Sequence, residues 1–187
     1  MDHRGTRTLT TSRLLLRRLT LDDVDQMFEN WASDPQVTPF LSWPPHANRD
    51  VTRALLTDWV AQYEDPTVHR WGVTVDGVLI GTIDVVRSVE SVGLAEVGYC
   101  YGRPWWGRGY ATEALRAVIG ELFAIGYHKV EAVHDPDNVA SGRVMDKAGM
   151  VREGLRRACI RTNMGIRDSQ YHGLLRSEWP ADAYLMS

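Results

Sequence analysis

The sequence predicts a single α/β domain, and the observations behind this fold class are its length, its unbroken organisation and its alternating pattern. The chain has 187 residues, close to the length of one ordinary domain. No internal repeat, low-complexity segment or long linker divides it. Strand patterns alternate with helix patterns, and turn signals recur between them. We therefore expect one domain over residues 1–187, with its core at about 12–180.

The first half of the chain is predicted to contain a strand, two helices and a hairpin. Thr20 can cap a helix together with Asp23, and an apolar, proline-rich loop at 40–46 precedes a second helix. Two strand patterns flank the dipeptide Asp76-Gly77, which is typical of a tight turn. The expected elements are a strand at 13–19, a helix after Thr20, a helix from about Asn48, and strands at 71–75 and 78–85.

The second half is predicted to alternate between strands and helices before it ends in an antiparallel hairpin. Gly149 is a typical helix stop, and the final turn passes through Asn163 and Gly165. The expected elements are a strand at 94–101, a helix at about 111–125, a strand at 129–134, a helix at 138–148, and strands at 151–161 and 167–179.

The charge of the chain argues against a role in nucleic-acid binding. It carries 21 basic and 24 acidic residues, a formal net charge of -3, so it is not a polycation. Arginines gather near the last hairpin, but Glu153 and Asp168 lie among them, which is typical of a solvated face. These arginines are Arg152, Arg156, Arg157, Arg161 and Arg167. The slight acidity of the whole chain would suit a cationic substrate.

The N-terminus, the histidines and the cysteines give no sign of a membrane span, a metal site or a disulfide. No stretch approaches the roughly 20 apolar residues of a membrane span, and the N-terminus is polar, so we expect a cytoplasmic protein without membrane contact. Cys100 and Cys159 lie in strand patterns without CxxC spacing, and the histidines lack metal-ligand spacing. The sequence therefore predicts buried thiols and no metal ion.

The most informative segment is 101–115, where a strand passes through a glycine-containing loop directly into a helix. Free backbone N–H groups and the helix dipole favour an anion at such a junction, and Gly107 and Gly109 allow it to approach the backbone. The dinucleotide fingerprint fails because Thr112 replaces its third glycine. The nucleotide-triphosphate loop fails because Arg108 and Gly109 replace its Lys-Ser/Thr pair.

The segment 106–111 resembles the acyl-CoA loop of the GNAT N-acetyltransferase superfamily, whose signature is Gln/Arg-x-x-Gly-x-Gly/Ala. Gly109 and Ala111 match this signature, whereas Trp106 departs from its first position. Trp-Gly-x-Gly-Tyr-Ala-Thr-Glu-Ala is familiar in the branch with the RimJ and RimL ribosomal-protein acetyltransferases. The resemblance to that branch continues at 12–18, 96–99, 138–149 and 174–179, and so covers nearly the whole chain.

This resemblance implies a fold and a cosubstrate. The expected fold is a single GNAT-like domain whose mixed, mostly antiparallel central sheet is splayed at its middle and flanked by helices. Acetyl-CoA would bind in the splay, without a metal. The residues implied for its binding are Tyr99, Cys100, Tyr101, Trp106, Gly107, Arg108, Gly109, Tyr110, Ala111, Thr112, Asn138 and Ser141.

Acetyl transfer to an amine requires an unprotonated nitrogen and stabilisation of the leaving thiolate. Glu96 is the candidate general base, or else it binds the cation of the acceptor. Many superfamily members place a tyrosine acid seven residues after the helix asparagine, and Met145 stands there. We therefore expect Ser141 to hydrogen-bond the thiolate, with Tyr99 and His134 as weaker options.

The acceptor itself is not named by the sequence. Trp43 and its apolar loop have the character of an acceptor-site wall, although such a loop can also simply cover a sheet edge. Direct attack in a ternary complex is expected, because the motif places neither cysteine for an acyl-enzyme. The resemblance suggests a protein N-terminal α-amine. Polyamines, amino acids and aminoglycosides stay open as acceptors, as do a non-catalytic acyl-CoA sensor and a homodimer through exposed strand edges.

Overall fold

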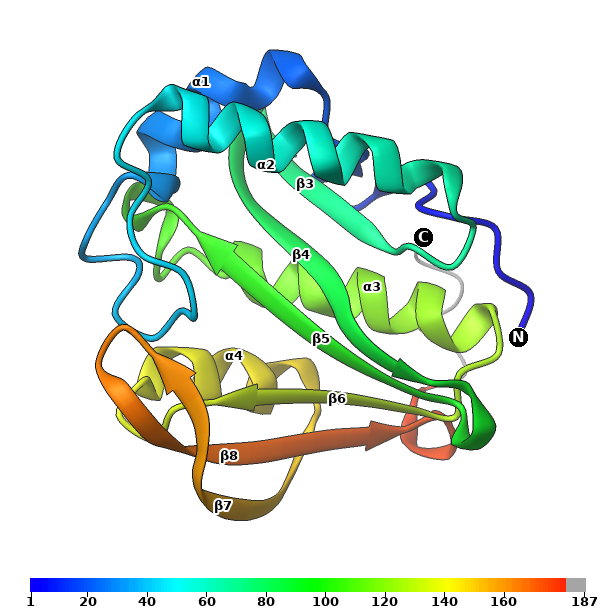
Figure 1. The fold of residues 1–187 in the computed structure, drawn as a ribbon. Coiled ribbons are helices and arrows are strands. Elements are labelled where there is room, and N and C mark those ends of the chain that lie inside the picture. The colour runs from blue at the N-terminus through cyan, green and yellow to red at the C-terminus, as the bar shows by residue number, and fades with distance from the viewer. Residues whose placement is uncertain (181–187) are drawn as a thin grey trace.

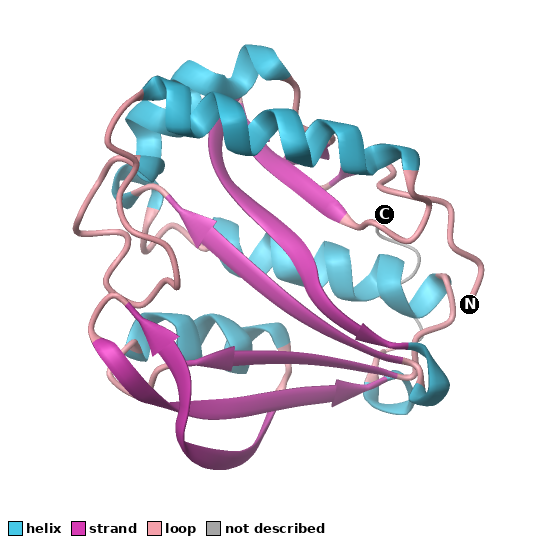
Figure 2. Cartoon of the chain, in the orientation of Figure 1, coloured by secondary structure: helices cyan, strands magenta, loops and turns pink. Residues whose placement is uncertain are grey.

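The computed structural model describes residues 1–180, which form one open sheet with helices on both faces (Figures 1 and 2). The strands are β1 (Leu9–Thr10), β2 (Leu15–Arg17), β3 (Arg70–Val75), β4 (Val78–Val89), β5 (Leu94–Tyr101), β6 (Lys129–His134), β7 (Val151–Thr162) and β8 (Gly165–Leu175). The helices are α1 (Val24–Met27), α2 (Arg49–Ala61), α3 (Tyr110–Ala124) and α4 (Val139–Ala148). Short helical turns are η1 (Leu21–Asp23), η2 (Phe28–Ala32), η3 (Gln62–Glu64), η4 (Glu90–Val92), η5 (Arg103–Trp105) and η6 (Arg176–Glu178).

The eight strands follow the order β1-β2-β3-β4-β5-β6-β8-β7, and every neighbouring pair except β5–β6 is antiparallel. The parallel pair is joined only where Leu94–Glu96 faces Lys129–Glu131. Beyond Glu96 the two strands diverge, as Figure 1 shows. The predicted fold class, a mostly antiparallel sheet splayed at its middle, is therefore confirmed.

Two apolar clusters hold the helices on opposite faces of the sheet. The larger one joins the buried side of α3 to inward residues of the central strands, including Ala95, Val97 and Tyr101 of β5. The smaller one joins α1 and α2 to Leu79 of β4, with Cys100 of β5 packed against it. Because side chains alternate along a strand, β5 presents Tyr99 toward α3 and α4, and Glu96 and Gly98 toward the α1–α2 side.

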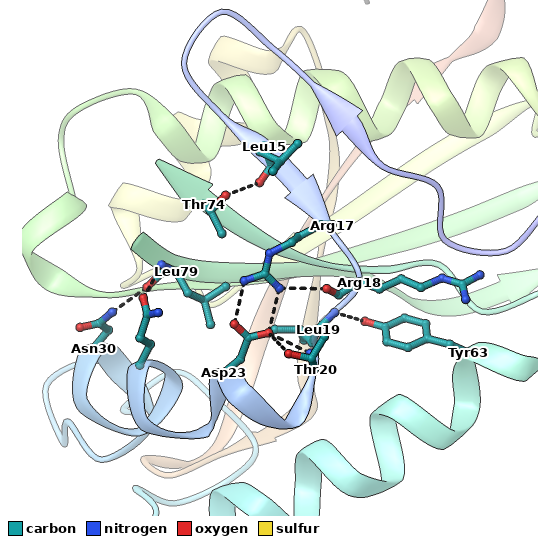
Figure 3. Close-up of polar contacts among 11 residues, drawn as sticks. Leu15, Arg17, Arg18, Leu19, Thr20, Asp23, Asn30, Tyr63, Thr74 and Leu79 are labelled. Atoms are coloured by element: carbon teal, nitrogen blue, oxygen red, sulfur yellow. Dashed lines mark hydrogen bonds and ion pairs between the residues drawn. The ribbon is translucent and has the colours of Figure 1, made fainter. Parts of the chain in front are cut away.

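The segment after β2 is less regular than the sequence predicts. In place of one helix after Thr20, a 3-10 turn, the short α1 and a π-helical turn follow one another. Figure 3 shows how this start is fixed: buried Asp23 accepts from the Thr20 backbone N–H at 2.8 Å and from both Arg17 amino groups at 2.8 and 2.7 Å. Hydrogen bonding to Asp23 raises the pKa of Arg17. Tyr63 adds a tie, since its hydroxyl accepts from the Leu19 backbone N–H at 3.0 Å.

Several local expectations need correction at the ends of elements. The strand expected at 13–19 is limited to Leu15–Arg17, and it pairs with β1, which no sequence pattern predicts. The last strand stops at Leu175, because the chain then turns through η6. The prediction of buried thiols is wrong for Cys159, which lies exposed on the edge strand β7.

Candidate active site

The divergence of β5 from β6 opens a cavity of about 380 Å³. Its walls come from both sides of the sheet: the loop before α2, the ends of β5 and β6, the first turn of α4, and the end of β7. The lining residues are Phe40, Leu41, Ser42, Val97, Gly98, Tyr99, Val133, His134, Asp135, Asn138, Ser141, Ile160, Arg161 and Thr162. The structure thus brings three of the predicted site residues, Tyr99, Asn138 and Ser141, to one cavity.

A pair of hydroxyl groups lies in this cavity between β5 and α4. The Tyr99 hydroxyl is 2.9 Å from Ser141 Oγ and donates to the Ser141 carbonyl oxygen at 3.1 Å. Burial raises the pKa of Tyr99, so its phenol stays protonated at neutral pH. Met145, which stands where the resemblance leads us to expect a tyrosine, is buried in the core. On the β5 and α4 walls of the cavity the hydroxyl groups are therefore those of Tyr99 and Ser141, while Ser42 and Thr162 line it from the loop before α2 and from β7.

The first turn of α4 is held by Asn138, whose side-chain oxygen accepts from the Ser141 backbone N–H at 3.3 Å. Asn138 is thus both the N-cap of α4 and part of the cavity wall. Beside it, His134 Nδ1 donates to the Asp135 carbonyl oxygen at 2.8 Å, while its Nε2 is buried without a hydrogen-bond partner in residues 1–180. The ring of His134 lies close against Gly142, where an added Cβ would approach Nε2 to 2.9 Å.

The glycine loop leads into α3 with an open backbone surface. Gly107 and Gly109 have φ of +72° and +83°, and a Cβ at Gly107 would have no atom within 4 Å. The first bond into α3 runs from the Glu113 N–H to the Gly109 carbonyl at 3.0 Å, so the amides of Tyr110, Ala111 and Thr112 precede any helical acceptor. This arrangement suits a phosphate, as the sequence predicts for this loop.

Residues outside the loop hold it in place, and the sequence analysis did not find them. The carboxylate of Glu113 accepts from Thr11 Oγ1 at 2.6 Å and from Arg13 Nε at 2.7 Å. Arg13 also donates to the Arg108 carbonyl at 3.0 Å, and its guanidinium lies 4.7 Å from the centre of the Tyr110 ring. The turn between β1 and β2 is therefore tied to the start of α3.

Glu96 lies at the closed end of the splay and is not among the residues that line the cavity. Its carboxylate accepts from Arg87 Nε at 2.9 Å, and Arg87 also donates to Glu131 at 3.2 Å. The nearest residue on the same face of β5 is Gly98, which does line the cavity. Two residues of a strand span about 7 Å, so Glu96 lies about this far along β5 from the cavity-lining Gly98.

Three further predicted residues lie apart from the cavity. Trp43 packs beside the ring of His46, with centroids 5.2 Å apart, while its neighbours Phe40, Leu41 and Ser42 form the wall. Cys100 faces the α1–α2 cluster, and burial raises the pKa of its thiol to about 12. The buried Tyr101 instead offers its carbonyl oxygen to Trp106 Nε1 at 2.7 Å, which anchors the half-exposed indole next to the glycine loop.

One asparagine at the tip of the β7–β8 hairpin joins the hairpin to the loop before α2. The Asn163 backbone N–H donates to the Leu41 carbonyl at 3.0 Å, and its side-chain amide donates to the carbonyls of Thr38 and Trp43 at 2.8 and 2.7 Å. Figure 1 shows these two distant segments meeting above the splay. Sequence analysis placed Asn163 in a turn, but no local pattern indicates a contact so far along the chain.

Two wider properties of the described residues bear on the type of site. Within residues 1–180, no three His, Cys, Asp or Glu side chains gather as a metal-binding group would require. In the same part of the chain, none of the helices has the length and apolar character needed to cross a membrane.

Comparisons with known proteins agree with this geometry. Residues 13–151 match the family described as the acetyltransferase (GNAT) domain. The N-acetyltransferase p20 of Bacillus licheniformis is 31% identical over 179 residues, which cover 92% of this chain and 98% of p20. YdaF of Bacillus subtilis (strain 168), which is named as a ribosomal N-acetyltransferase, is 27% identical over 76% of this chain and 79% of its own.

A solved structure gives the same answer at the level of the fold. The crystal structure of a GNAT-family acetyltransferase from Bacillus anthracis superposes with a TM-score of 0.80 at 26% identity, over 92% of this chain and all of the other. This chain therefore shares both its sequence pattern and its overall fold with known GNAT acetyltransferases. The chain belongs to the GNAT family of acetyltransferases and is an acyltransferase enzyme, as its sequence predicts.

Proposed function

We propose that this enzyme transfers the acetyl group of acetyl-CoA to a primary amine by direct attack in a ternary complex. The observation that carries this proposal is the cavity between β5 and β6, which is lined by residues from elements on both sides of the sheet. One partner can then enter beside α3 and α4, and the other beside the loop before α2. This meets the requirement that two reactants be held together in one orientation.

The residues present fit acetyl-CoA. The space around Gly107 and the free amides at the start of α3 suit a pyrophosphate, because the positive end of the helix dipole adds to them. Asn138 and Ser141 line the cavity and can hydrogen-bond a pantetheine arm. Bound there, acetyl-CoA supplies an acetyl group activated as a thioester.

Two groups of the chain would move or hold protons. Glu96 is proposed as the base that removes a proton from the acceptor ammonium through water, since it lies one step along β5 from the cavity-lining Gly98. Tyr99 and Ser141 are proposed as hydrogen-bond donors to the leaving sulfur, since their hydroxyls lie together in the cavity.

An acyl-enzyme route has little support. Cys100 faces away from the cavity and its pKa is raised to about 12, so it carries almost no thiolate at neutral pH. Cys159 lies exposed on β7 and does not line the cavity. Attack by the amine itself is therefore the simpler route.

For the acceptor we propose an α-amine, such as the N-terminus of a protein. An α-amine has a pKa near 8 and needs less help from a base than a lysine or polyamine nitrogen near 10.4. The name of YdaF supports a ribosomal acceptor for that protein, and the shared family extends this idea here. Such a substrate would place the enzyme in the cytoplasm.

A thiol-release assay tests the proposal. Acetyl-CoA is mixed with the purified enzyme and a panel of peptides, amino acids, polyamines and aminoglycosides, and free CoA thiol is measured over time. We expect acceptor-dependent release together with a product heavier by one acetyl group. Tight binding of acetyl-CoA without turnover of any acceptor would instead indicate an acyl-CoA sensor.

A further inference from the structure

The acceptor side of the cavity is a preassembled wall. It consists of Phe40, Leu41 and Ser42 from the loop before α2 and of Ile160–Thr162 from the end of β7. Asn163 joins the two segments through the carbonyls of Thr38, Leu41 and Trp43, at distances of 2.7 to 3.0 Å. Because both segments are fixed to each other, the backbone positions from which they present side chains to an acceptor are fixed as well, and the Arg161 side chain is exposed there.

The cavity lining as a whole has one positive charge without a compensating partner in residues 1–180, that of Arg161. Among the described lining residues, the ionisable side chains apart from Tyr99 are His134, Asp135 and Arg161. Asp135 is held by Arg167, which donates to it at 2.6 and 3.2 Å and lowers its pKa, so this carboxylate is already compensated. Arg161 makes no ion pair with any residue between 1 and 180.

The β-bulge in β7 lies directly before Ile160–Thr162, the three residues of this strand that line the cavity. The register with β8 shifts between Arg156 and Ile160, where Ala158 has φ +49° and donates its N–H to Asp168 at 2.9 Å. Regular pairing resumes at Ile160, and Arg161 then lies opposite Ile166. A bulge re-aims the side chains that follow it. Arg157 lies inside the bulge and does not line the cavity.

We propose that the acceptor carries an anionic group, a carboxylate or a phosphate, near its amine, and that Arg161 binds this group. The inference rests on the proposed amine acetylation and adds the chemical class of the acceptor. A guanidinium presents paired N–H donors that match both anions. A polyamine or aminoglycoside would meet the charge of Arg161 and no uncompensated carboxylate in the described wall. The net acidity of the chain is thus a poor guide, because the acidic groups at the splay are paired: Asp135 is held by Arg167, and Glu96 and Glu131 are held by Arg87.

Matched acceptor pairs test this proposal. Alanine is compared with alaninamide, phosphoethanolamine with ethanolamine, and the peptide Ala-Glu-Gly-amide with Ala-Lys-Gly-amide, so that the source of the anion is distinguished. The measured quantity is the ratio of kcat/KM within each pair. The paired amines also differ in the pKa of the amine, which affects the ratio in the same way for every enzyme variant. We therefore compare the ratio of the wild type with the ratio of R161Q. R157Q is the control, since it removes an arginine of the same strand that does not line the cavity.

We expect R161Q to reduce the preference for the anionic member by about tenfold or more in at least one pair, as the loss of a charged hydrogen bond predicts. R157Q should leave that preference unchanged. The proposal is overturned if R161Q leaves every ratio unchanged, or if it raises only the KM for acetyl-CoA, which would place Arg161 at the cosubstrate.

Binding separates this inference from the proposed function. If no acceptor turns over, the same pairs are titrated by calorimetry into the enzyme saturated with CoA. If the wild type binds the anionic members and R161Q does not, the inference about Arg161 is supported, although acetyl transfer to these amines is refuted. Equal binding of both members of every pair, or binding of none, would overturn it.

Discussion

Tyr99 and Ser141 form one hydrogen-bonded pair. The Tyr99 hydroxyl lies 3.1 Å from the Ser141 carbonyl oxygen and 2.9 Å from Ser141 Oγ; each hydroxyl carries one proton, and either can donate across the 2.9 Å contact. A sulfur atom in the cavity would compete for one of these protons. The sequence analysis identified Ser141 as the donor and Tyr99 as a weaker choice, but the structure makes them one hydrogen-bonded unit.

Substitution of each hydroxyl residue separates their roles. We expect Ser141→Ala to raise the barrier to acetyl transfer by about 1–3 kcal/mol, because a thiolate can leave without full protonation. Tyr99→Phe removes the other hydroxyl and keeps the ring. Single-turnover rates of the two variants provide the comparison. A larger loss in Tyr99→Phe than in Ser141→Ala would identify the phenol as the principal donor.

Glu96 is expected to act on the rate and not on cosubstrate binding. If it is the base, Glu96→Gln should lower kcat by about 10²–10⁴-fold and flatten the acidic limb of the pH profile. Glu131→Gln is the matched control, since Glu131 lies directly opposite Glu96 and is bound by the same Arg87. It removes a similar ion pair from the same place.

The two variants should therefore differ in kcat by a large factor, while both keep their affinity for acetyl-CoA. Equal loss in both would indicate that Arg87 and its partners only stabilise the closed end of the splay. If Glu96→Gln instead raises the acceptor KM and leaves kcat intact, the carboxylate binds the acceptor.

At the scale of elements, the glycine loop is supported by a turn that lies about 100 residues away in the sequence. Thr11 and Arg13 bond the carboxylate of Glu113 across |i−j| separations of 102 and 100 residues. The loop is thus fixed before any ligand arrives. Its free amides can then bind an anion with little further loss of conformational freedom.

Gly107→Val tests the loop against a control with the same backbone strain. Both Gly107 and Gly77 have positive φ, +72° and +79°, and neither would have an atom within 4 Å of an added Cβ. Each substitution should cost about 1–3 kcal/mol of stability, because valine adopts this conformation poorly. Only Gly107→Val should weaken acetyl-CoA binding, by about tenfold or more, as measured by calorimetry on the folded variants. Equal affinity in both would exclude the loop from cosubstrate binding.

The elements that the sequence predicts well are those with local signals. The strands on either side of Gly77 pair as a hairpin, α3 starts after Gly109, and Asn138 caps α4. Each depends on residues a few positions apart. The short β1, the π-helical turn at Phe28–Ala32 and the Asn163 contacts have no such signal, because their partners are distant in the chain.

The residues of the candidate site also fall into those that the sequence indicates and those that it does not. Tyr99, Asn138 and Ser141, which the motif indicates, line one cavity, whereas Trp43, which is predicted from its apolar character, packs beside His46. Arg161 was counted as part of a solvated face, since its position at the cavity depends on a bulge that the sequence does not indicate.

At the scale of the whole molecule, the Asp135–Arg167 pair connects the end of β6 to β8 beneath the cavity. Asp135 is buried and its pKa is lowered by hydrogen bonding to Arg167. A carboxyl with a lowered native pKa stabilises the fold above its unfolded value, about 3.9, and this contribution is lost as pH falls through the native value.

We therefore expect Asp135→Asn to lose on the order of 1–3 kcal/mol between pH 5 and 7. The gap from the wild type should begin to shrink below about pH 4, where the unfolded carboxyl takes up a proton, and should close as the pH falls through the lowered native pKa. Urea unfolding across this pH range provides the measurement. Asp137→Asn is the control, because Asp137 also pairs with Arg167 but is largely exposed. A gap that persists undiminished at pH 3 would mean that packing, and not charge, causes the loss.

The strand order β6-β8-β7 also determines how long β6 is without its partner while the chain is being synthesised. β6 is complete at His134, but the strand that pairs with it begins only at Gly165, after α4 and β7 have been made. At about 5–20 residues per second, the intervening stretch of roughly 30 residues leaves the ribosome over a few seconds. During that interval the open edge of β6 has no native partner, and nascent chains on neighbouring ribosomes can pair with it. β6 pairs with β5 over only a short length, which produces the catalytic splay, and its other edge stays unpaired until β8 has been made. The splay and the interval of exposure therefore both arise from β6.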